Sequence, residues 1–419
     1  MRTRMRRVTF LTAVVSAAAA ALVPASAMAG SSGGGLVPTG NAWGTFVKVG
    51  QVAKSGHTAL AVLGCGHDRD TNDVAAVHVP GLRTGVVRSR THTFDVNGGS
   101  GSQSVNVIHN VNLLDGQITA DAVRAVSRTS YDGSRFTGGG KRSEFVGLRI
   151  AGKKYSVKAS GRVDLPGIGY VQLNRQTRAN NGAGHVTQMV VVHVTRNVPN
   201  LQLTAGTVIV VGHALTAVKR VGGFLGGYAF GSQAILSGGA PLGANAGRSA
   251  LVYVSCHGTD NAVRSNQILN LGVPSVFALS NVQSTAQGEV GGSKASLRLT
   301  DTIEQADVLQ GLIDAKGIRA VAEGSVKDGV RHFDSRGSRF AELSVTGFPA
   351  IDVSVPRNTR LSILDLGTLW LHRVIRKDNQ IEVRMIELLV RKPNALGLPV
   401  GADVQVGVAR AVIRNPGAG

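Results

Sequence analysis

A short polar segment at residues 65–73, CGHDRDTND, gathers the side chains in this chain that are best suited to bind a metal ion. Asp68, Asp70 and Asn72 place oxygen ligands at alternate positions, which is how a calcium-binding loop begins. Such a loop needs glycine at its sixth position and glutamate at its twelfth, but this segment has aspartate and valine there. The calcium hypothesis therefore competes with a polar loop whose Asp and Asn side chains satisfy the backbone of turns.

The chain has two cysteines, Cys65 and Cys256, and each lies early in one half of the sequence. In a secreted protein two thiols normally pair, so we predict a disulfide that joins the two halves. A bridge that closes so long a loop stabilises by up to about 5 kcal/mol in the chain-entropy model. The alternatives are free or intermolecular thiols, or a zinc site formed by Cys65, His67 and a carboxylate.

Basic residues are concentrated between positions 141 and 162, a stretch in which Glu144 is the only acidic residue. On alternating strands and their turn, several of these side chains would share one face. A basic face on a secreted protein attracts anionic wall polymers, acidic polysaccharide or lipid headgroups in a salt-sensitive manner, and the alternative is a merely solvated surface. The candidate polyanion-binding residues are Lys141, Arg142, Arg149, Lys153, Lys154, Lys158 and Arg162.

The positive charge is unevenly distributed along the chain, which has 45 Lys and Arg against 25 Asp and Glu. Four of the arginines lie in residues 1–29, residues 30–245 carry 21 − 9 = +12, and residues 246–419 carry 20 − 16 = +4. Nucleic acid is not the partner we expect, because aromatic residues are 4% of the chain and no reader motif is present. We expect no cofactor either.

No arrangement typical of an enzyme stands out, since G-x-S-x-G, H-E-x-x-H, P-loop and Rossmann patterns are all missing from the sequence. His193 and His213 lie in strand-like patterns of the first half, and apolar residues stand at the corresponding places of the second half. Packing or surface roles suit them better than chemistry. A pair of acidic residues acting on a glycan stays open as an alternative.

Residues 1–29 have the pattern of a signal peptide. Four arginines precede the apolar run Val8–Val23, and Ala27-Met28-Ala29 supplies a cleavage site of small residues. The alternative is a membrane anchor, for which the run is short and rich in alanine. We therefore predict a secreted, extracellular or wall-associated protein that is not an integral membrane protein.

The rest of the chain is organised as two diverged copies of one module. The segment 113–126, LLDGQITADAVRAV, returns at 309–321 as LQGLIDAKGIRAV, and further matches follow in order to the end of each half. The predicted boundaries are a signal peptide at 1–29, a flexible leader at 30–42, a first β module at 43–220, a Gly/Ala-rich linker at 221–247, a second β module at 248–414 and a tail at 415–419.

The local patterns within each copy are those of β-strands. Residues 187–195 are β-branched with polar residues interleaved, and residues 381–390 alternate between charged and apolar side chains. Asp-Gly and Asn-Gly pairs punctuate them at hairpin-like intervals. The segment 113–126 fits a helical turn or a strand, and its continuation favours a strand. We predict an all-β protein with one β-sandwich-like module per copy, and a β-solenoid is the alternative.

The residues of the first copy resemble one known family. The patterns at Ile118–Ser127, Leu148–Gly152, Gly169–Gln176 and Gly206–Ala214 are similar to those of the choice-of-anchor P family, which comprises secreted or surface domains of bacteria. The second copy matches more loosely. The resemblance implies a cell-surface protein and supplies no catalytic residues, and the anchor it implies is missing. The sequence thus favours a secreted, envelope-associated structural or binding protein, with a secreted carbohydrate-active or other hydrolytic enzyme as the alternative.

Overall fold

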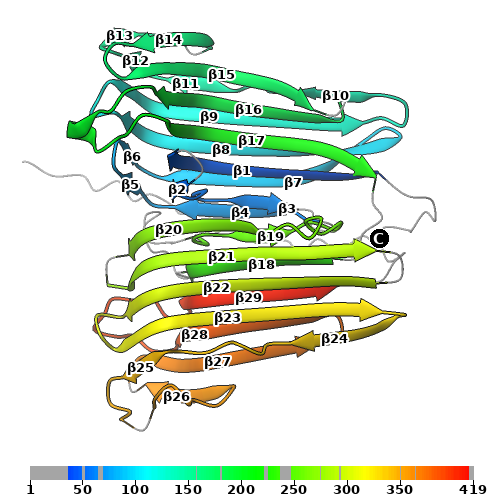
Figure 1. Ribbon diagram of the computed structural model, residues 1–419, viewed down its shortest axis with the longest axis vertical. Coiled ribbons are helices and arrows are strands. Elements are labelled where there is room, and N and C mark those ends of the chain that lie inside the picture. Colours follow the sequence, from blue (N-terminus) through cyan, green and yellow to red (C-terminus); the bar gives the residue numbers. More distant parts are fainter. Residues whose placement is uncertain are drawn as a thin grey trace, which may run out of the picture.

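The computed structural model describes residues 36–414, apart from gaps at 50–51, 65–68, 157, 180–181, 221–224, 236–246, 274, 292–293, 350 and 364. Its regular structure is antiparallel β-strand, and the helical element whose bounds it defines is the short 3-10 turn η2, Pro199–Leu201. The strands run across the long axis of an elongated molecule, in two β-sandwiches stacked end to end (Figure 1). The all-β prediction is confirmed.

The first module, residues 36–220, packs one sheet of long strands against a second sheet that has irregular edges. One layer belongs to the first module alone, and we name it sheet 2. Its central strands β4, β7, β8 and β9 are neighbours in that order, and shorter strands flank them. The opposing strands belong to the larger sheet 1, in the order β14, β15, β16, β17 and β1. The strands of sheet 2 are β4 (Arg69–Val74), β5 (Val77–Val79), β6 (Leu82–Thr84), β7 (Val87–Val96), β8 (Gly99–Leu113), β9 (Ile118–Tyr131), β10 (Phe136–Gly139), β11 (Glu144–Val146), β12 (Arg149–Ile150) and β13 (Lys153–Lys154), and those of sheet 1 are β1 (Leu36–Val49), β2 (Val52–Ser55), β3 (Ala61–Leu63), β14 (Gly161–Leu165), β15 (Gly169–Ala179), β16 (Gly184–Val194) and β17 (Thr207–Arg220).

The second module, residues 225–414, repeats this arrangement with the two layers exchanged. In the second module, the layer that corresponds to the one with β1 and β17 is a separate sheet. We name it sheet 3, and its strand order is β19, β18, β29, β28, β27 and β26. The other layer of this module continues sheet 1. The strands of sheet 3 are β18 (Leu225–Ile235), β19 (Val252–Val254), β26 (Thr359–Ile363), β27 (Gly367–Lys377), β28 (Gln380–Val390) and β29 (Asp403–Ile413), and those added to sheet 1 are β20 (Arg264–Val273), β21 (Phe277–Gly291), β22 (Lys294–Val308), β23 (Ile313–Lys327), β24 (Val330–Asp334) and β25 (Glu342–Val345).

The two modules share a continuous sheet. Strand β2 pairs with β1 on one side and with β20 on the other, so sheet 1 runs through both sandwiches (Figure 1). Each module also has its own apolar core, because alternate residues of the long strands point inward and bury their side chains between the two layers. The two sandwiches thus have separate cores and are joined by one shared sheet.

The repeated segment 113–126 is a turn followed by a framework strand, as the sequence favoured. In the first copy, Leu114 and Asp115 form the turn with positive φ angles of 55° and 50°. In the second copy, Leu309 and Gln310 form the equivalent turn with φ angles of 57° and 55°. A glycine with positive φ follows each pair, which is how a tight reversal between long strands is made. Strands β9 and β23 then occupy equivalent places in the two sandwiches. We interpret these matches as the result of an internal duplication.

The predicted module boundaries need correction at two places. The stretch 221–247, predicted as a linker, contains β18, which pairs over its whole length with β29 of the second module. The stretch 30–42, predicted as a leader, contains the first residues of β1, which pair with β17. Both stretches are rich in glycine, a composition that predicts flexibility. The structure uses at least one of these glycines for close packing instead, because a Cβ on Gly227 would lie 2.1 Å from the carbonyl oxygen of Arg410.

The predicted signal peptide at 1–29 and tail at 415–419 lie outside the described residues. Among those described, no helix has the length and apolar character of a membrane span.

Candidate functional site

The junction between the modules is held by two buried asparagines that each reach across to the other module. Asn72 of the first module accepts a hydrogen bond from the backbone N–H of Arg248 at 2.8 Å. Its side-chain amide donates to the carbonyl oxygen of Arg248 at 3.1 Å and to that of Leu60 at 3.0 Å. With 4% of its surface exposed, Asn72 is a structural clamp whose polar atoms are all engaged.

Asn266 of the second module makes the reciprocal contacts. It accepts from the backbone N–H of His57 at 2.9 Å and donates to the carbonyl oxygen of Leu251 at 2.9 Å. Backbone hydrogen bonds beside the two clamps also correspond, since Gly56 and Gly247 each donate to the other module at 2.7 Å. Contacts that are exchanged in this way are the mark of a twofold arrangement, here between two halves of one chain.

These contacts correct the predicted metal site. The described part of that segment is β4, a strand, and within it Asp70 accepts the N–H of Val62 at 2.8 Å and forms an ion pair with Arg248 at 2.6 Å. Because Asp70 and Asn72 are committed to these partners, they do not form the open turn that a calcium loop requires. Asp68 lies outside the described residues. No cluster of potential metal ligands is found elsewhere in the part of the chain that the structure describes.

A small apolar pocket of about 220 Å³ lies at the junction. Equivalent segments of the two modules line it, 74–79 from the first and 268–273 from the second, together with His57 and Arg248. Burial lowers the pKa of His57 to about 4, so its ring is neutral at physiological pH.

An aromatic stack lies beside this pocket, on the outer face of β1 and β17. Trp43 stacks on His213 with their ring centroids 4.3 Å apart, and His57 lies 4.5 Å from Trp43 and 4.8 Å from Phe46. Burial, with the nearby charge of His57, lowers the pKa of His213 to about 3. A neutral imidazole stacked on indole serves packing, and His193 likewise stacks on Tyr170 at 4.6 Å.

The outer face of sheet 2 carries a row of basic side chains that the sequence did not reveal. Arg69 on β4 pairs in register with His92 on β7, which is followed by Gln103 on β8 and Arg128 on β9. Burial, and then the charges of Arg69 and Arg128, lower the pKa of His92. The guanidinium of Arg128 lies 3.8 Å from the ring centroid of Phe94, which holds it flat against the sheet.

This row continues into a shallow pocket of about 420 Å³, which is lined in part by Arg128, Lys141 and Arg142. We name the exposed cations of this surface the basic face. Two neighbouring arginines on the same side are neutralised, Arg88 by Asp73 at 3.1 Å and Arg124 by Glu144 at 3.8 Å. Within the described part of the chain, no ion pair involves the members of the basic face, which are Arg69, Arg90, Arg128, Lys141 and Arg142.

The predicted basic cluster is therefore divided between two places. Lys141 and Arg142 join the basic face, in the turn between β10 and β11. The other members lie at the free end of the first module, around β12, β13 and β14 (Figure 1). Of these, Arg149 and Lys154 are cross-strand neighbours, and Arg162 forms an ion pair with Asp164 at 2.9 Å. The members at the free end, all exposed, are Arg149, Lys153, Lys154, Lys158 and Arg162.

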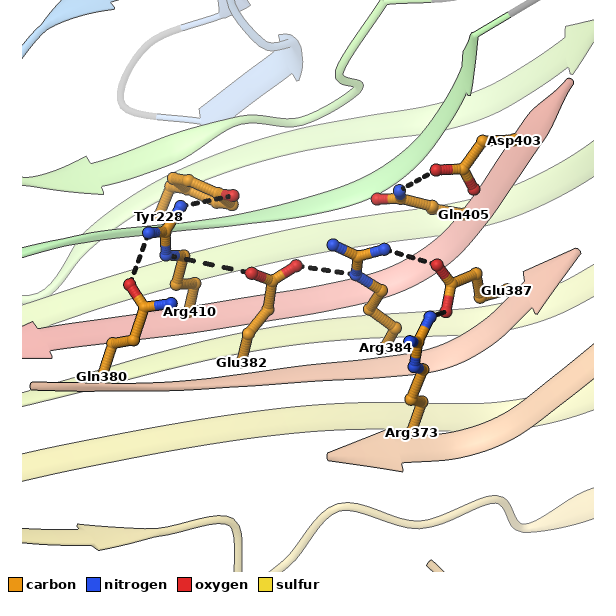
Figure 2. Close-up of polar contacts among 9 residues, drawn as sticks. All are labelled: Tyr228, Arg373, Gln380, Glu382, Arg384, Glu387, Asp403, Gln405 and Arg410. Carbon is orange, nitrogen blue, oxygen red and sulfur yellow. Dashed lines mark hydrogen bonds and ion pairs between the residues drawn. The ribbon is translucent and has the colours of Figure 1, made fainter. Parts of the chain in front are cut away.

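The second module presents a different surface, in which alternating charges cross the outer face of sheet 3 (Figure 2). Glu382 lies between Arg410, at 3.8 Å, and Arg384, at 2.7 Å, and Glu387 lies between Arg384 and Arg373. Burial alone would lower the pKa of Arg384, but the two carboxylates raise it. Glu387 is 1% exposed because the guanidinium groups cover it.

This network seals its carboxylates instead of offering them to a substrate. Each of these two glutamates is held between two arginines, whose guanidinium groups engage its carboxylate oxygens. Asp403, whose pKa is raised by burial, is engaged by the side-chain amide of Gln405 at 2.7 Å. The paired acids that a glycan hydrolase would need are therefore not presented by this surface.

The predicted disulfide falls partly outside the described residues, because Cys65 lies in a gap. Cys256 is 3% exposed and is not a free thiol. Its pairing with Cys65 stays a prediction.

Comparisons with models of protein families, with curated proteins and with solved structures give no match for this chain.

Proposed function

We propose that this protein is a secreted, cell-envelope-associated binding protein that holds anionic wall polymers against the basic face of its first module. The observation that carries the proposal is a set of five exposed cations that have no ion pair with any residue the structure describes, Arg69, Arg90, Arg128, Lys141 and Arg142. They stand next to arginines that do have acidic partners.

The geometry of this face suits an extended polyanion. The row from Arg69 to Arg128 crosses four neighbouring strands, which is a span of about 15 Å at the usual spacing between strands. Each contact of an exposed cation with a phosphate or carboxylate contributes little alone. Several contacts to one polymer add up, and they are screened by salt. We therefore expect binding that is strong at low ionic strength and reversible.

The sequence supports the location of this activity. Residues 1–29 have the pattern of a signal peptide, and the first module resembles the choice-of-anchor P family of surface domains. Electrostatic contact with the wall would help to retain a secreted protein at the cell surface. We propose a Cys65–Cys256 disulfide as a further adaptation to an oxidising compartment. Titration of the unreduced, denatured protein should find no free thiol, and two free thiols would contradict the disulfide.

The proposal is tested by removing charge from the basic face. The variant Arg90→Gln/Arg128→Gln/Arg142→Gln should cosediment with purified cell walls at least about tenfold less than the unchanged protein at low salt. The matched control, Arg175→Gln/Arg178→Gln/Arg196→Gln, removes the same charge from exposed positions of the same module that lie off this face. Equal loss in both variants would show that only net charge matters, and would overturn the proposal.

A further inference from the structure

A second basic pocket, of about 740 Å³, opens on the second module where β18, β24, β29 and the turn between β27 and β28 meet. Four of its side chains are cationic and one is a carboxylate, Asp378. Tyr228 and Gln380 add a hydroxyl group and an amide, and Figure 2 shows both beside Arg410. The four cations are Arg331, Lys377, Arg410 and Arg414.

The fold fixes each wall of this pocket. Arg376 donates a hydrogen bond to the carbonyl oxygen of Phe333 at 2.9 Å, which ties the turn after β27 to β24 and so brings Lys377 towards Arg331. Arg410 is held by Gln380 at 2.5 Å and by the hydroxyl of Tyr228 at 3.3 Å. The pocket is thus assembled from both sheets of the sandwich.

One further cation, Arg414, lies against a glycine. A Cβ built on Gly226 would be 3.8 Å from its Nε atom, an ordinary contact distance, so the guanidinium lies beside β18 at this glycine. Burial and the charge of Arg410 lower the pKa of Arg414. Two guanidinium groups that repel each other, partly removed from water, are a local cost that a bound anion would relieve.

The charge in this pocket is poorly neutralised. Arg410 must share Glu382 with Arg384, and in the described part of the chain Arg331, Lys377 and Arg414 have no ion pair. The Nε atom of Arg331 is buried and has no hydrogen-bond partner among the described residues. On the same outer face of sheet 3, Arg373 and Arg384 both form ion pairs with the buried carboxylate of Glu387.

Two arginines of the pocket, Arg331 and Arg410, stand at positions that are not cationic in the first module. Tyr228 pairs with Arg410 where the first module has Asn41 opposite Leu215. Val326 pairs with Arg331 where the first module has Tyr131 opposite Phe136. The framework therefore does not require these arginines.

We propose that this pocket binds a phosphate group of an anionic ligand, with Arg331, Arg410 and Arg414 as its principal donors. The planar, forked guanidinium matches phosphate oxygens in pairs, and three of these groups around one opening favour phosphate over a carboxylate. Tyr228 and Gln380 are placed to contact the polyol or sugar that carries the phosphate. This site lies in the second module and does not depend on the basic face of the first.

The test uses the full mature chain with the basic face already neutralised by Arg90→Gln/Arg128→Gln/Arg142→Gln, so that the first module does not contribute. In this background a soluble glycerol phosphate oligomer is titrated calorimetrically against the protein, against Arg331→Gln/Lys377→Gln/Arg414→Gln and against the matched control Arg264→Gln/Lys294→Gln/Arg357→Gln. The control residues are exposed cations of the same module outside the pocket. A galacturonate oligomer of equal charge serves as the carboxylate probe.

We expect the pocket variant to bind the phosphate oligomer at least about tenfold more weakly than the background protein, and the control to remain within about twofold. We expect the galacturonate oligomer to bind at least about tenfold more weakly than the phosphate oligomer. No binding in the background protein, equal loss in both variants, or equal affinity for the two oligomers would each overturn the proposal. Urea unfolding of each variant confirms that its fold is intact.

Discussion

The two modules share a framework but differ in the part of the core that lies between their long strands. In the first module, Ser102 and Ser104 on β8 face Thr129 and Ser127 on β9, and all four are buried. At the same places, the second module has Leu297 and Leu299 on β22 opposite Gly324 and Ala322 on β23. The same backbone arrangement therefore accepts both a hydroxyl-rich and an aliphatic core.

Hydrogen bonds between the sheets explain how the polar core is stable. Ser102 donates to the carbonyl oxygen of Thr39 and Ser104 to that of Leu215, each at 2.8 Å, so hydroxyl groups of sheet 2 reach the backbone of sheet 1. Ser127 donates to the carbonyl oxygen of His185 at 2.8 Å. Small side chains allow the layers to approach closely, and each buried hydroxyl then finds a partner.

One position in the second module departs from its aliphatic surroundings. Asn106 of the first module donates to the hydroxyl of Ser89 at 2.9 Å, and Asp301 accepts from Ser284 at 2.6 Å at the equivalent place. Burial raises the pKa of Asp301 to about 7, and within the described part of the chain one of its carboxylate oxygens accepts no hydrogen bond. At equivalent positions of one framework, the first module therefore has a neutral amide and the second module has an ionisable acid.

The largest effect is expected where an aliphatic residue is replaced by its counterpart from the polar core. Leu299→Ser should destabilise the protein by about 3–5 kcal/mol, because it leaves a cavity and a hydroxyl group without the partners that Ser104 has. Urea denaturation measures the change. A cost below about 1 kcal/mol would show that the two cores are interchangeable, contrary to this account.

A pH-dependent effect is expected at Asp301. Since its folded pKa is raised from 3.8 to about 7, the stability that it contributes is present below about pH 4 and lost as the pH rises through 7. Asp301→Asn, which copies Asn106, should therefore stabilise the protein by roughly 2–4 kcal/mol at pH 8 and have little effect at pH 4. A difference in the free energy of unfolding between variant and unchanged protein that does not vary with pH would contradict the raised pKa of the buried Asp301 carboxyl.

The junction provides a test of equivalence between the modules. Asn72→Ala and Asn266→Ala should each lower the free energy of unfolding by about 2 kcal/mol, because each leaves backbone groups of the opposite module without a hydrogen-bond partner. Since the two clamps are reciprocal, the midpoints of urea unfolding should shift by similar amounts. A large effect of one variant and none of the other would show that the junction is not twofold.

The smallest effect is expected for a single hydroxyl. Ser127→Ala should lower the free energy of unfolding by about 1–2 kcal/mol, because its hydrogen bonds to Thr216 and to the backbone of His185 are lost. The reverse change in the second module, Ala322→Ser, should also destabilise, because the hydroxyl would enter an aliphatic core. Stabilisation by either change, measured by thermal unfolding, would contradict the match between each hydroxyl and its partner.

The sequence predicted most of the framework, because hydrophobic alternation and turn glycines are local signals. It did not predict the role of Asn72, since the partner of this residue lies 176 positions away on the other module. The glycines of β18 misled the boundary prediction for a related reason. Gly227 closely approaches the backbone of Arg410, and Gly231 closely approaches the side chain of Val282. Glycine required by close approach has the same sequence pattern as a flexible linker.

The sequence likewise did not predict how the basic surfaces are assembled. A cluster such as 141–162 is visible along the chain, and the structure splits it between the basic face and the free end of the first module. The row from Arg69 to Arg128 draws its cations from separate strands, and only their register brings them together. The pocket around Arg414 depends likewise on strands β18, β24 and β29 meeting. Signals that depend on pairing between distant strands do not appear in local spacing.

Cosedimentation of the mature protein with cell walls tests the central proposal most directly. The same walls are used intact and after chemical removal of their anionic polymers, over a series of salt concentrations. Binding to intact walls at low salt, released by salt and lost from the stripped walls, is the result we predict. Equal binding to intact and stripped walls, or binding that salt does not weaken, would contradict it.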